Sequence, residues 1–277
     1  MNSVNHIAIQ GIKGSFHHSV AKKCFDKIGQ FTECMTFDAL VDSLLQKNVD
    51  IAIMAIENSI AGSIIPNYAL IDSNDVQITG EYYLDIQHNL MALSNQTIAD
   101  IKEVHSHPMA LLQCKAFFKN YPHIKLVEAK DTADVAKYIS KHQKKGIAAI
   151  ASTTASELYG LSILEHSIQT IKHNETRFVI LSNNDNAYNE ESINKASLKF
   201  ELGIERGSLA AILNVLSDCK LNLTKIQSLP KINTPWRYAF FVDVTFDTYS
   251  DYEKAKSIVS IMAENFKILG EYKNRKL

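Results

Sequence analysis

The chain has 277 residues, a length that holds one large domain or two smaller ones, each with its own core. Hydrophobic residues make up 46% and charged residues 21% of the sequence, a balance typical of a soluble globular protein. The net charge of −1 gives no basic surface for nucleic acid or for an anionic membrane, and no apolar run is long enough to span a bilayer. We therefore expect no nucleic-acid partner and no membrane partner.

The cysteines and histidines suggest a reduced, metal-free protein. The first residues lack a basic segment followed by an apolar one, so the sequence predicts no signal peptide. The cysteines are scattered without a CxxC pair, which indicates buried, reduced thiols and a cytoplasmic protein. His105 and His107 stand two residues apart, but no third ligand accompanies them, and the sequence has no dinucleotide fingerprint. We expect neither a metal nor a cofactor.

Strands and helices alternate through the first part of the chain. Strands are predicted at residues 6–10, 31–37, 50–58, 101–106, 123–129, 146–151 and 178–181. Helices are predicted at residues 15–28, 38–48, 107–120 and 131–143, the last with Asp131 or Thr132 as its N-cap. This alternation predicts an α/β architecture with mostly parallel sheets.

Residues 182–197 are polar and nearly free of core residues, so we interpret them as a linker that divides the chain near residue 187. Beyond it, strands are predicted at residues 198–204, 222–229, 237–246 and 267–273, and helices at residues 207–219 and 250–266. The order βαββαβ is that of the ferredoxin-like motif. Such a four-stranded sheet leaves edges and one face with which two copies can pair.

Polar residues gather where the predicted strands of the first part end. Ligands of open α/β sheets bind outside the carboxyl ends of the strands. Glu57, Asn58 and Ser59 directly follow a seven-residue apolar strand. Burying three such polar side chains away from water would cost free energy. The other residues in such positions are Gly11, Gly14, Ser15, Ser106, His107, Gln113, Thr176 and Arg177.

Each of these residues also has a purely structural explanation. The "GxxGS" stretch is an ordinary tight turn and N-cap, Ser106 and Pro108 form a good helix start, and Gln113 fits a solvated helix face. Their shared position at strand ends nevertheless favours a cleft. Hydroxyls, amides, backbone N–H groups and one arginine suit a small anionic molecule, with weak acids available for proton donation.

Six motifs in chain order carry a family resemblance: GIKGSF, AIENSIAGSI, SHPMALLQC, KDTADVAKYI, AAIASTTASELYGLSIL and NETRF. Over nearly its whole length the chain resembles a prephenate dehydratase with a C-terminal ACT regulatory domain. The resemblance implies a two-lobed, periplasmic-binding-protein-like catalytic domain at residues 1–186, with lobe 1 at about 1–78 and 160–186 and lobe 2 at about 79–159. It also implies a ferredoxin-like βαββαβ ACT domain at residues 197–277.

The implied reaction is the decarboxylating dehydration of prephenate to phenylpyruvate in L-phenylalanine biosynthesis, without a cofactor. Aromatisation drives the loss of carbon dioxide, so the enzyme must place the dianion and help the ring hydroxyl to depart. The resemblance implies Thr176 as the proton donor, with Glu57 in a relay or as a support for Asn58. Arg177 is either a carboxylate clamp or a support behind the site. The implied substrate contacts are Asn58, Ser15, Ser59, Ser106, Gln113 and Arg177.

Two further stretches resemble the ACT effector motifs. They are Gly207-Ser208-Leu209 and residues 222–230, which begin with Asn222 and Leu223. The resemblance implies feedback by L-phenylalanine and a homodimer or homotetramer. Two charged residues of the family's second motif are replaced here by Gln227 and Leu229, so we expect inhibition at higher phenylalanine concentration. A proline of the first catalytic motif is replaced by Ile12, which the turn should tolerate.

Two other functions remain open on the sequence. One is arogenate dehydratase, which performs the same chemistry on a substrate with an amine in place of the side-chain keto group. The other is a catalytically silent amino-acid sensor, against which the joint presence of Thr176 and the Glu57–Ser59 cluster argues. We expect no fused chorismate mutase, because no helical domain precedes residue 5.

Overall fold

The structure, a computed structural model, describes residues 3–183, 192–231 and 234–276. These residues form two compact units. Unit 1 comprises Met1–Ser63 and Tyr83–Phe178, and unit 2 comprises Ile64–Tyr82 and Val179–Leu277. No helix in the described ranges is long and apolar enough to cross a membrane. Half of the predicted linker, residues 184–191, lies outside the described residues.

The first sheet of the chain has the strand order β2-β1-β3-β11-β5, with β4 paired to β3. Its elements in unit 1 are β1 Ser3–Gln10, α1 Phe16–Cys24, β2 Lys27–Cys34, α2 Phe37–Leu45, β3 Ile51–Asn58 and β4 Gly62–Ser63. The strand β1 runs parallel to both β2 and β3. Five residues of β3 are buried in succession, because a parallel strand covered by helices has no solvated face.

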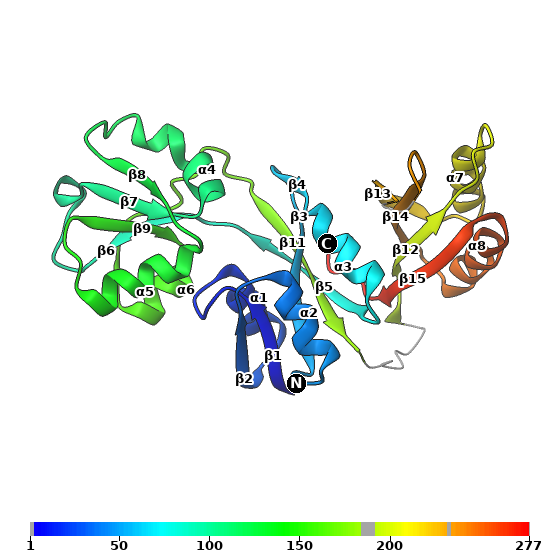
Figure 1. Cartoon of the computed structure of the whole chain (residues 1–277), viewed down its shortest axis with the longest axis horizontal. Helices are drawn as coiled ribbons and strands as arrows, with labels where there is room; N and C mark the ends of the chain where they lie inside the picture. The colour runs from blue at the N-terminus through cyan, green and yellow to red at the C-terminus, as the bar shows by residue number, and fades with distance from the viewer. Residues whose placement is uncertain (1–2, 184–191, 232–233, 277) are drawn as a thin grey trace. The chain divides into compact units, whose positions relative to one another are not determined.

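The second sheet lies entirely in unit 1 and has the order β10-β6-β9-β7-β8. Its elements are β6 Asn89–Ala92, η1 Ile98–Asp100, β7 Glu103–Ser106, α4 Pro108–Phe118, β8 Lys125–Glu128, α5 Thr132–His142, β9 Ile147–Ala151, α6 Thr153–Tyr159 and β10 Ser162–Glu165. Alternate residues of β9 enter two cores: Ala148 and Ile150 pack with α4, whereas Ala149 and Ala151 pack with α5 and α6. Figure 1 shows α4 on one side of this sheet and α5 and α6 on the other.

Unit 2 contains a four-stranded antiparallel sheet with the order β13-β14-β12-β15. Its elements are β12 Lys195–Glu201, α7 Ser208–Asp218, β13 Asn222–Pro230, β14 Tyr238–Thr245, α8 Tyr249–Met262 and β15 Glu264–Tyr272, which gives the expected order βαββαβ. Ala196, Leu198 and Phe200 of β12 face a core that also holds residues of α7 and α8. Unit 2 also includes α3 Ile65–Ser73 and parts of β5 Gln77–Asp85 and β11 Glu175–Ser182.

The face of this sheet that the helices leave free is not open, contrary to the expectation from its topology. Residues of α3 and β5 cover it: the Tyr68 ring packs edge-on against Phe241, and a Cβ added at Gly270 would lie 2.1 Å from the Ile78 carbonyl oxygen. Lys195 of β12 forms an ion pair of 2.8 Å with Glu81 of β5. The covered face cannot pair with a second copy.

Replacing Glu81 with glutamine should strongly destabilise unit 2. The Lys195 and Glu81 side chains are 3% and 0% exposed, and removing one charge of such a pair leaves the other buried without compensation. We expect the free energy of unfolding to fall by about 3–5 kcal/mol in chemical denaturation. The control is Lys254→Met, which breaks the solvent-exposed pair with Asp251 and should cost below about 1 kcal/mol. Equal losses in the two variants would contradict a stabilising role for the buried pair.

Two predicted helices end earlier than expected. α1 ends at Cys24, and β2 begins at Lys27, so the predicted helix end at residue 28 is wrong. Gly29 lies in β2 so close to β1 that a Cβ would stand 2.5 Å from the Asn5 carbonyl oxygen. α8 ends at Met262 rather than at residue 266, because Ala263 adopts an extended backbone conformation (φ −99°, ψ 151°) and β15 begins at Glu264.

Candidate functional site

Asn58, the last residue of β3, is the centre of a hydrogen-bonded cluster at the edge of the first sheet. Its Oδ1 accepts hydrogen bonds from the backbone N–H groups of Ile60 (3.0 Å) and Ala61 (2.8 Å). Its Nδ2 donates to Asn174 Oδ1 (2.7 Å) and to Thr176 Oγ1 (2.9 Å). The two backbone donors fix the orientation of the amide, so Asn58 presents its nitrogen to Thr176.

Thr176 is buried in β11 with its hydroxyl directed at Asn58. The Asn58 nitrogen can only donate, so the Thr176 oxygen acts as the acceptor in this contact. Among the described residues, none accepts a hydrogen bond from the Thr176 hydroxyl. The proton of this hydroxyl therefore remains available for an acceptor that enters the site.

The cluster continues from Asn58 to the second sheet. Asn174 Nδ2 donates to Gln113 Oε1 (2.9 Å), and the same oxygen lies 2.9 Å from His88 Nε2. Asn174 and His88 are both buried. Gln113 stands on α4, so this series of contacts joins the two sheets of unit 1.

Ser59 and Glu57 hold the segments on either side of Asn58. Ser59 Oγ accepts from the Glu175 N–H (3.0 Å), and the Ser59 N–H donates to the Glu175 carbonyl (2.8 Å). Glu57 is half-buried and pairs with Ser63 of β4. These contacts fix the start of β11 against the end of β3, and so they fix Thr176 against Asn58.

Three other predicted site residues are buried outside the cluster. Ser15 caps α1, accepting from the His18 N–H, and it donates to the Gln10 carbonyl. The Ser106 side chain is 0% exposed and its hydroxyl donates to the Ile150 carbonyl (2.7 Å), so it ties β7 to β9. Arg177 is buried next to Thr176 in β11. The structure therefore brings Asn58, Thr176 and Gln113 together, and it places Ser15 and Ser106 in backbone contacts.

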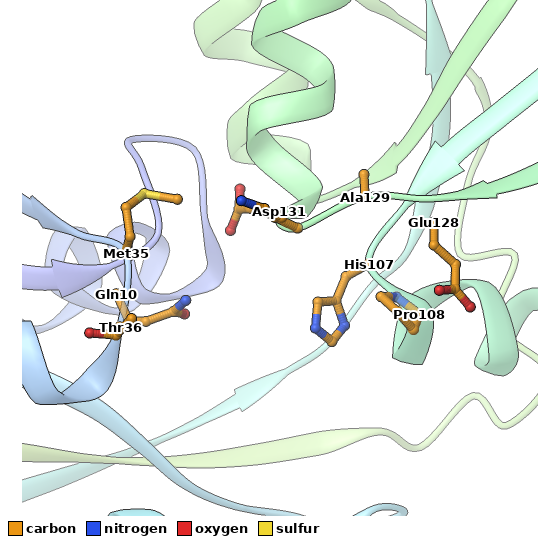
Figure 2. Close-up of a pocket in the computed structure, with 9 residues that line it drawn as sticks. Gln10, Met35, Thr36, His107, Pro108, Glu128, Ala129 and Asp131 are labelled. Atoms are coloured by element: carbon orange, nitrogen blue, oxygen red, sulfur yellow. The ribbon is translucent and has the colours of Figure 1, made fainter.

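A cavity of about 670 Å³ lies in unit 1 between the ends of strands from both sheets. Figure 2 shows Gln10, Met35 and Thr36 on one wall and His107, Pro108, Glu128 and Ala129 on the other, with Asp131 between them. Lys130 also lines the cavity. Its lining does not include Asn58 or Thr176, but Gln10 ends β1 and Asn58 ends the neighbouring parallel strand β3. The cavity and the cluster thus belong to the same edge of the first sheet.

Three helices begin at the cavity. Thr36, His107 and Asp131 are the N-caps of α2, α4 and α5, and each accepts a hydrogen bond from the first turn of its helix. Burial raises the pKa of the Asp131 carboxyl above its ordinary value, against the hydrogen bonds of the Asp134 and Ala133 N–H groups. Helix N-termini favour negative charge, so these three ends suit an anionic ligand.

Glycine is required at the turn that borders this cavity. Gly11 adopts a φ of +80°, and a Cβ there would lie 2.6 Å from Asp131 Oδ2. The following residues contact α6: Ser152 Oγ donates to the Gly14 carbonyl (2.7 Å), and the Tyr159 hydroxyl donates to the Lys13 carbonyl. The "GIKGSF" turn therefore holds the two sheets of unit 1 together, a function that the "tight turn" interpretation did not include.

Sequence reasoning missed two members of the cluster, Asn174 and His88. Asn174 directly precedes the "ETRF" stretch and is 0% exposed, and Thr176 and Arg177 are also buried, whereas Glu175 is half-buried. His88 stands in "DIQHNL", a stretch without a strong pattern. No local signal marks His88, because its contact with Gln113 joins residues 25 positions apart in the chain.

The predicted effector residues lie at two places in unit 2. Gly207 has a φ of +84° and is the N-cap of α7, which begins with Ser208 and Leu209 and has no side-chain cap. Nothing lies within 4 Å of a Cβ added at Gly207, so its backbone is accessible. Asn222 and Leu223 begin β13, an edge strand of the sheet.

Known proteins resemble the chain in sequence. The family model described as prephenate dehydratase matches residues 7–186. The bifunctional chorismate mutase/prephenate dehydratase of Buchnera aphidicola subsp. Acyrthosiphon pisum is 34% identical over 275 residues, which cover 96% of this chain and 70% of that protein. Arogenate dehydratase 2 of Petunia hybrida is 37% identical over 226 residues, covering 81% of this chain and 56% of that protein.

Solved structures resemble the chain in fold. A protein described as GqqA, a novel type of quorum quenching acylase, has a TM-score of 0.86 at 25% identity, covering 97% of this chain and 98% of that one. The prephenate dehydratase of Arthrobacter aurescens in complex with L-Phe has a TM-score of 0.84 at 22% identity, covering 97% and 90%. Different activities are thus named on one fold, so the site must carry the functional argument.

Proposed function

The chain belongs to the prephenate dehydratase family, so its reaction is the decarboxylating dehydration of prephenate to phenylpyruvate, and we propose that Thr176 assists the departing hydroxyl. The observation that carries this proposal is the hydrogen bond from Asn58 Nδ2 to Thr176 Oγ1. It occupies the Thr176 oxygen as an acceptor and leaves its proton free to be donated.

The chemistry requires one proton at one oxygen. The bond between the ring carbon and its carboxylate breaks, and its electron pair completes the aromatic ring while carbon dioxide leaves. The bond between the ring and its hydroxyl breaks at the same time, and the departing oxygen must gain a proton to leave as water. A threonine hydroxyl is a weak acid, so Thr176 acts by donating a hydrogen bond along the developing negative charge. Solvent supplies the proton that is consumed, and Glu57 is proposed as a relay member beside Asn58.

The cavity suits the dianionic substrate. Its volume of about 670 Å³ lies within the range of small-molecule sites. Lys130 and three helix N-termini supply positive potential for carboxylates. We propose that Gln113 faces the substrate from the cluster, and that Ser15, Ser59 and Ser106 contribute through the backbone that their hydroxyls hold. Arg177 is proposed to support the site from behind, because successive side chains of a strand point to opposite faces.

Arogenate remains the second candidate substrate for one specific reason. Its ammonium group would find the carboxylates of Glu128 and Asp131 in the cavity lining. The experiment is a comparison of initial rates with prephenate and with arogenate, each followed by product absorbance. A kcat/KM at least tenfold higher for prephenate supports the proposal, and a preference for arogenate would reverse it. If neither substrate yields product, the chain is a silent sensor.

Residues 197–277 are proposed to form an ACT domain that binds L-phenylalanine. The accessible backbone at Gly207 and the uncapped start of α7 offer N–H donors to the carboxylate of an amino acid. Asn222 and Leu223 add a polar contact and an apolar wall. Gln227 bonds within its own strand, donating to the Ser228 carbonyl (3.0 Å).

Phenylalanine should bind, but weakly. Without the charged residues that Gln227 and Leu229 replace, a lost charge-assisted hydrogen bond lowers affinity by about 10- to 150-fold. We expect calorimetry to show saturable binding of L-phenylalanine and the dehydratase assay to show inhibition in the same concentration range. Absence of binding at millimolar phenylalanine would contradict this proposal and leave the domain as an assembly module.

A homodimer or homotetramer is proposed to form through the edge strand β13. The face of the sheet opposite to α7 and α8 is not available, because α3 and β5 cover it. Ile226 of this strand is exposed. Ile226→Glu should therefore shift light scattering toward the monomer mass, because a charge on the edge opposes strand pairing. Ile204→Glu is the control, since Ile204 is exposed outside the strands. An unchanged mass in Ile226→Glu would exclude the β13 edge.

A further inference from the structure

The orientation of every amide in the cluster follows from two backbone groups. The N–H groups of Ile60 and Ala61 can only donate, so Asn58 must present its oxygen to them. Its nitrogen then faces Asn174, which must present its own oxygen in return. The Asn174 nitrogen is thereby directed at Gln113, which accepts through Oε1.

The same logic fixes the protonation of a buried histidine. Gln113 Oε1 has no hydrogen, so His88 Nε2, 2.9 Å away, must carry the proton in their hydrogen bond. The other ring nitrogen, Nδ1, is then unprotonated. It is buried and has no hydrogen-bond partner among the described residues. The ring itself is 4% exposed and packs edge-on against Phe16.

We infer that His88 is a positioning residue for the dehydratase reaction: its Nε2–H holds Gln113 Oε1, so that the Gln113 amide nitrogen stays directed at the substrate. This inference rests on the proposed function of the cluster. Gln113 Oε1 accepts from both His88 and Asn174, and among the described residues nothing accepts from Gln113 Nε2. At the other end of the series, the Thr176 hydroxyl proton likewise has no acceptor among the described residues. One directed series of hydrogen bonds thus leaves two donors, the Gln113 amide and the Thr176 hydroxyl, for an oxygen-rich anion.

A role in packing alone does not account for this ring. A buried nitrogen without a partner costs free energy, and an apolar side chain of similar size would avoid that cost. Burial also lowers the pKa of His88, which keeps the ring neutral although its hydrogen bond to Gln113 favours the proton. The molecule therefore retains a histidine where only one of its two nitrogens is used, and that nitrogen contacts Gln113.

The first test reads the tautomer without reference to activity. Nitrogen-15 NMR of the imidazole groups should show His88 protonated on Nε2 and bare on Nδ1. His17 gives an internal control in the same spectrum, because its Nε2 accepts from the Ala55 N–H and its proton must lie on Nδ1. A His88 ring protonated on Nδ1 would overturn the inference, whatever the protein catalyses.

The second test separates positioning from packing. His88→Leu should lower kcat/KM for prephenate on the order of 10-fold, the scale of one lost hydrogen bond, and His88→Gln should recover most of it through its amide donor. His17→Leu removes a similarly buried imidazole outside the series, and it should lower thermal stability while kcat/KM stays within about twofold. Equal activities in His88→Leu and His17→Leu, or no recovery in His88→Gln, would overturn the positioning role. A wild-type protein that is inactive on both prephenate and arogenate would refute the proposed function. The NMR experiment tests the protonation of His88 independently of that activity.

Discussion

Replacing Thr176 with alanine is expected to lower kcat by a factor on the order of 100 or more, the scale of a lost proton donor. The hydroxyl is buried near the start of β11 and accepts a hydrogen bond from Asn58 Nδ2 at 2.9 Å. Among the described residues, none accepts its proton. Alanine removes the donor but keeps the backbone of β11. An assay that follows the absorbance of phenylpyruvate measures kcat, and circular dichroism of the purified variant checks that the fold is kept.

The loss should appear in kcat more than in KM. The donated hydrogen bond strengthens as charge develops on the leaving oxygen, so its removal affects the transition state more than the bound substrate. Thr79→Ala provides the control, because the Thr79 hydroxyl donates to the Ile180 carbonyl in unit 2. A Thr176→Ala enzyme with turnover close to that of the wild type would show that the donor is another group.

Replacing Asn58 with aspartate is the second change with a large expected effect, again on the order of 100-fold or more in kcat. The variant keeps the shape and keeps the oxygen that accepts from Ile60 and Ala61. Its second carboxylate oxygen, however, takes the place of the nitrogen that now faces Asn174 and Thr176. The Thr176 hydroxyl would then donate to this carboxylate, and its proton would be withdrawn from the substrate.

The same substitution also sets two oxygens against each other. Asn58 Nδ2 and Asn174 Oδ1 are 2.7 Å apart, a distance at which two acceptors repel. Asn174 must then rotate, which reverses the direction of the contacts to Gln113 and His88. Asn48→Asp is the matched control on an exposed loop, where the amide nitrogen donates to Gln46 Oε1. If Asn58→Asp retains kcat within a few fold, the direction of these hydrogen bonds does not matter to catalysis.

Asn58 and Thr176 could be proposed from the sequence because strand ends can be recognised one at a time. Asn58 is the last residue of one buried strand and Thr176 the second residue of another, and both positions could be found without knowing the pairing. Asn174 and His88 could not be found in this way. Their roles depend on contacts between residues 116, 61 and 25 positions apart in the chain, which no local pattern encodes.

The covered sheet face escaped prediction for a related reason. Lys195, Lys199 and Glu201 alternate with apolar residues along β12, a pattern typical of a strand with one solvated face. They are nevertheless buried, because Glu81 and Asp72 of unit 2 pair with the two lysines. Glu201 pairs with Lys199 and Lys231. The elements α3, β5 and β6 were also not predicted; α3 spans "IPNYALIDS", in which apolar and polar residues do not separate onto two faces.

The most direct measurement of the central claim is the ratio of kcat values for Thr176→Ser and Thr176→Val with prephenate. Serine keeps a hydroxyl that Asn58 can hold, whereas valine keeps only the shape of the side chain. Donation by the hydroxyl predicts that serine exceeds valine by a factor on the order of 10 or more while both proteins remain folded. Equal turnover in the two variants would contradict it, because shape alone would then account for what Thr176 contributes.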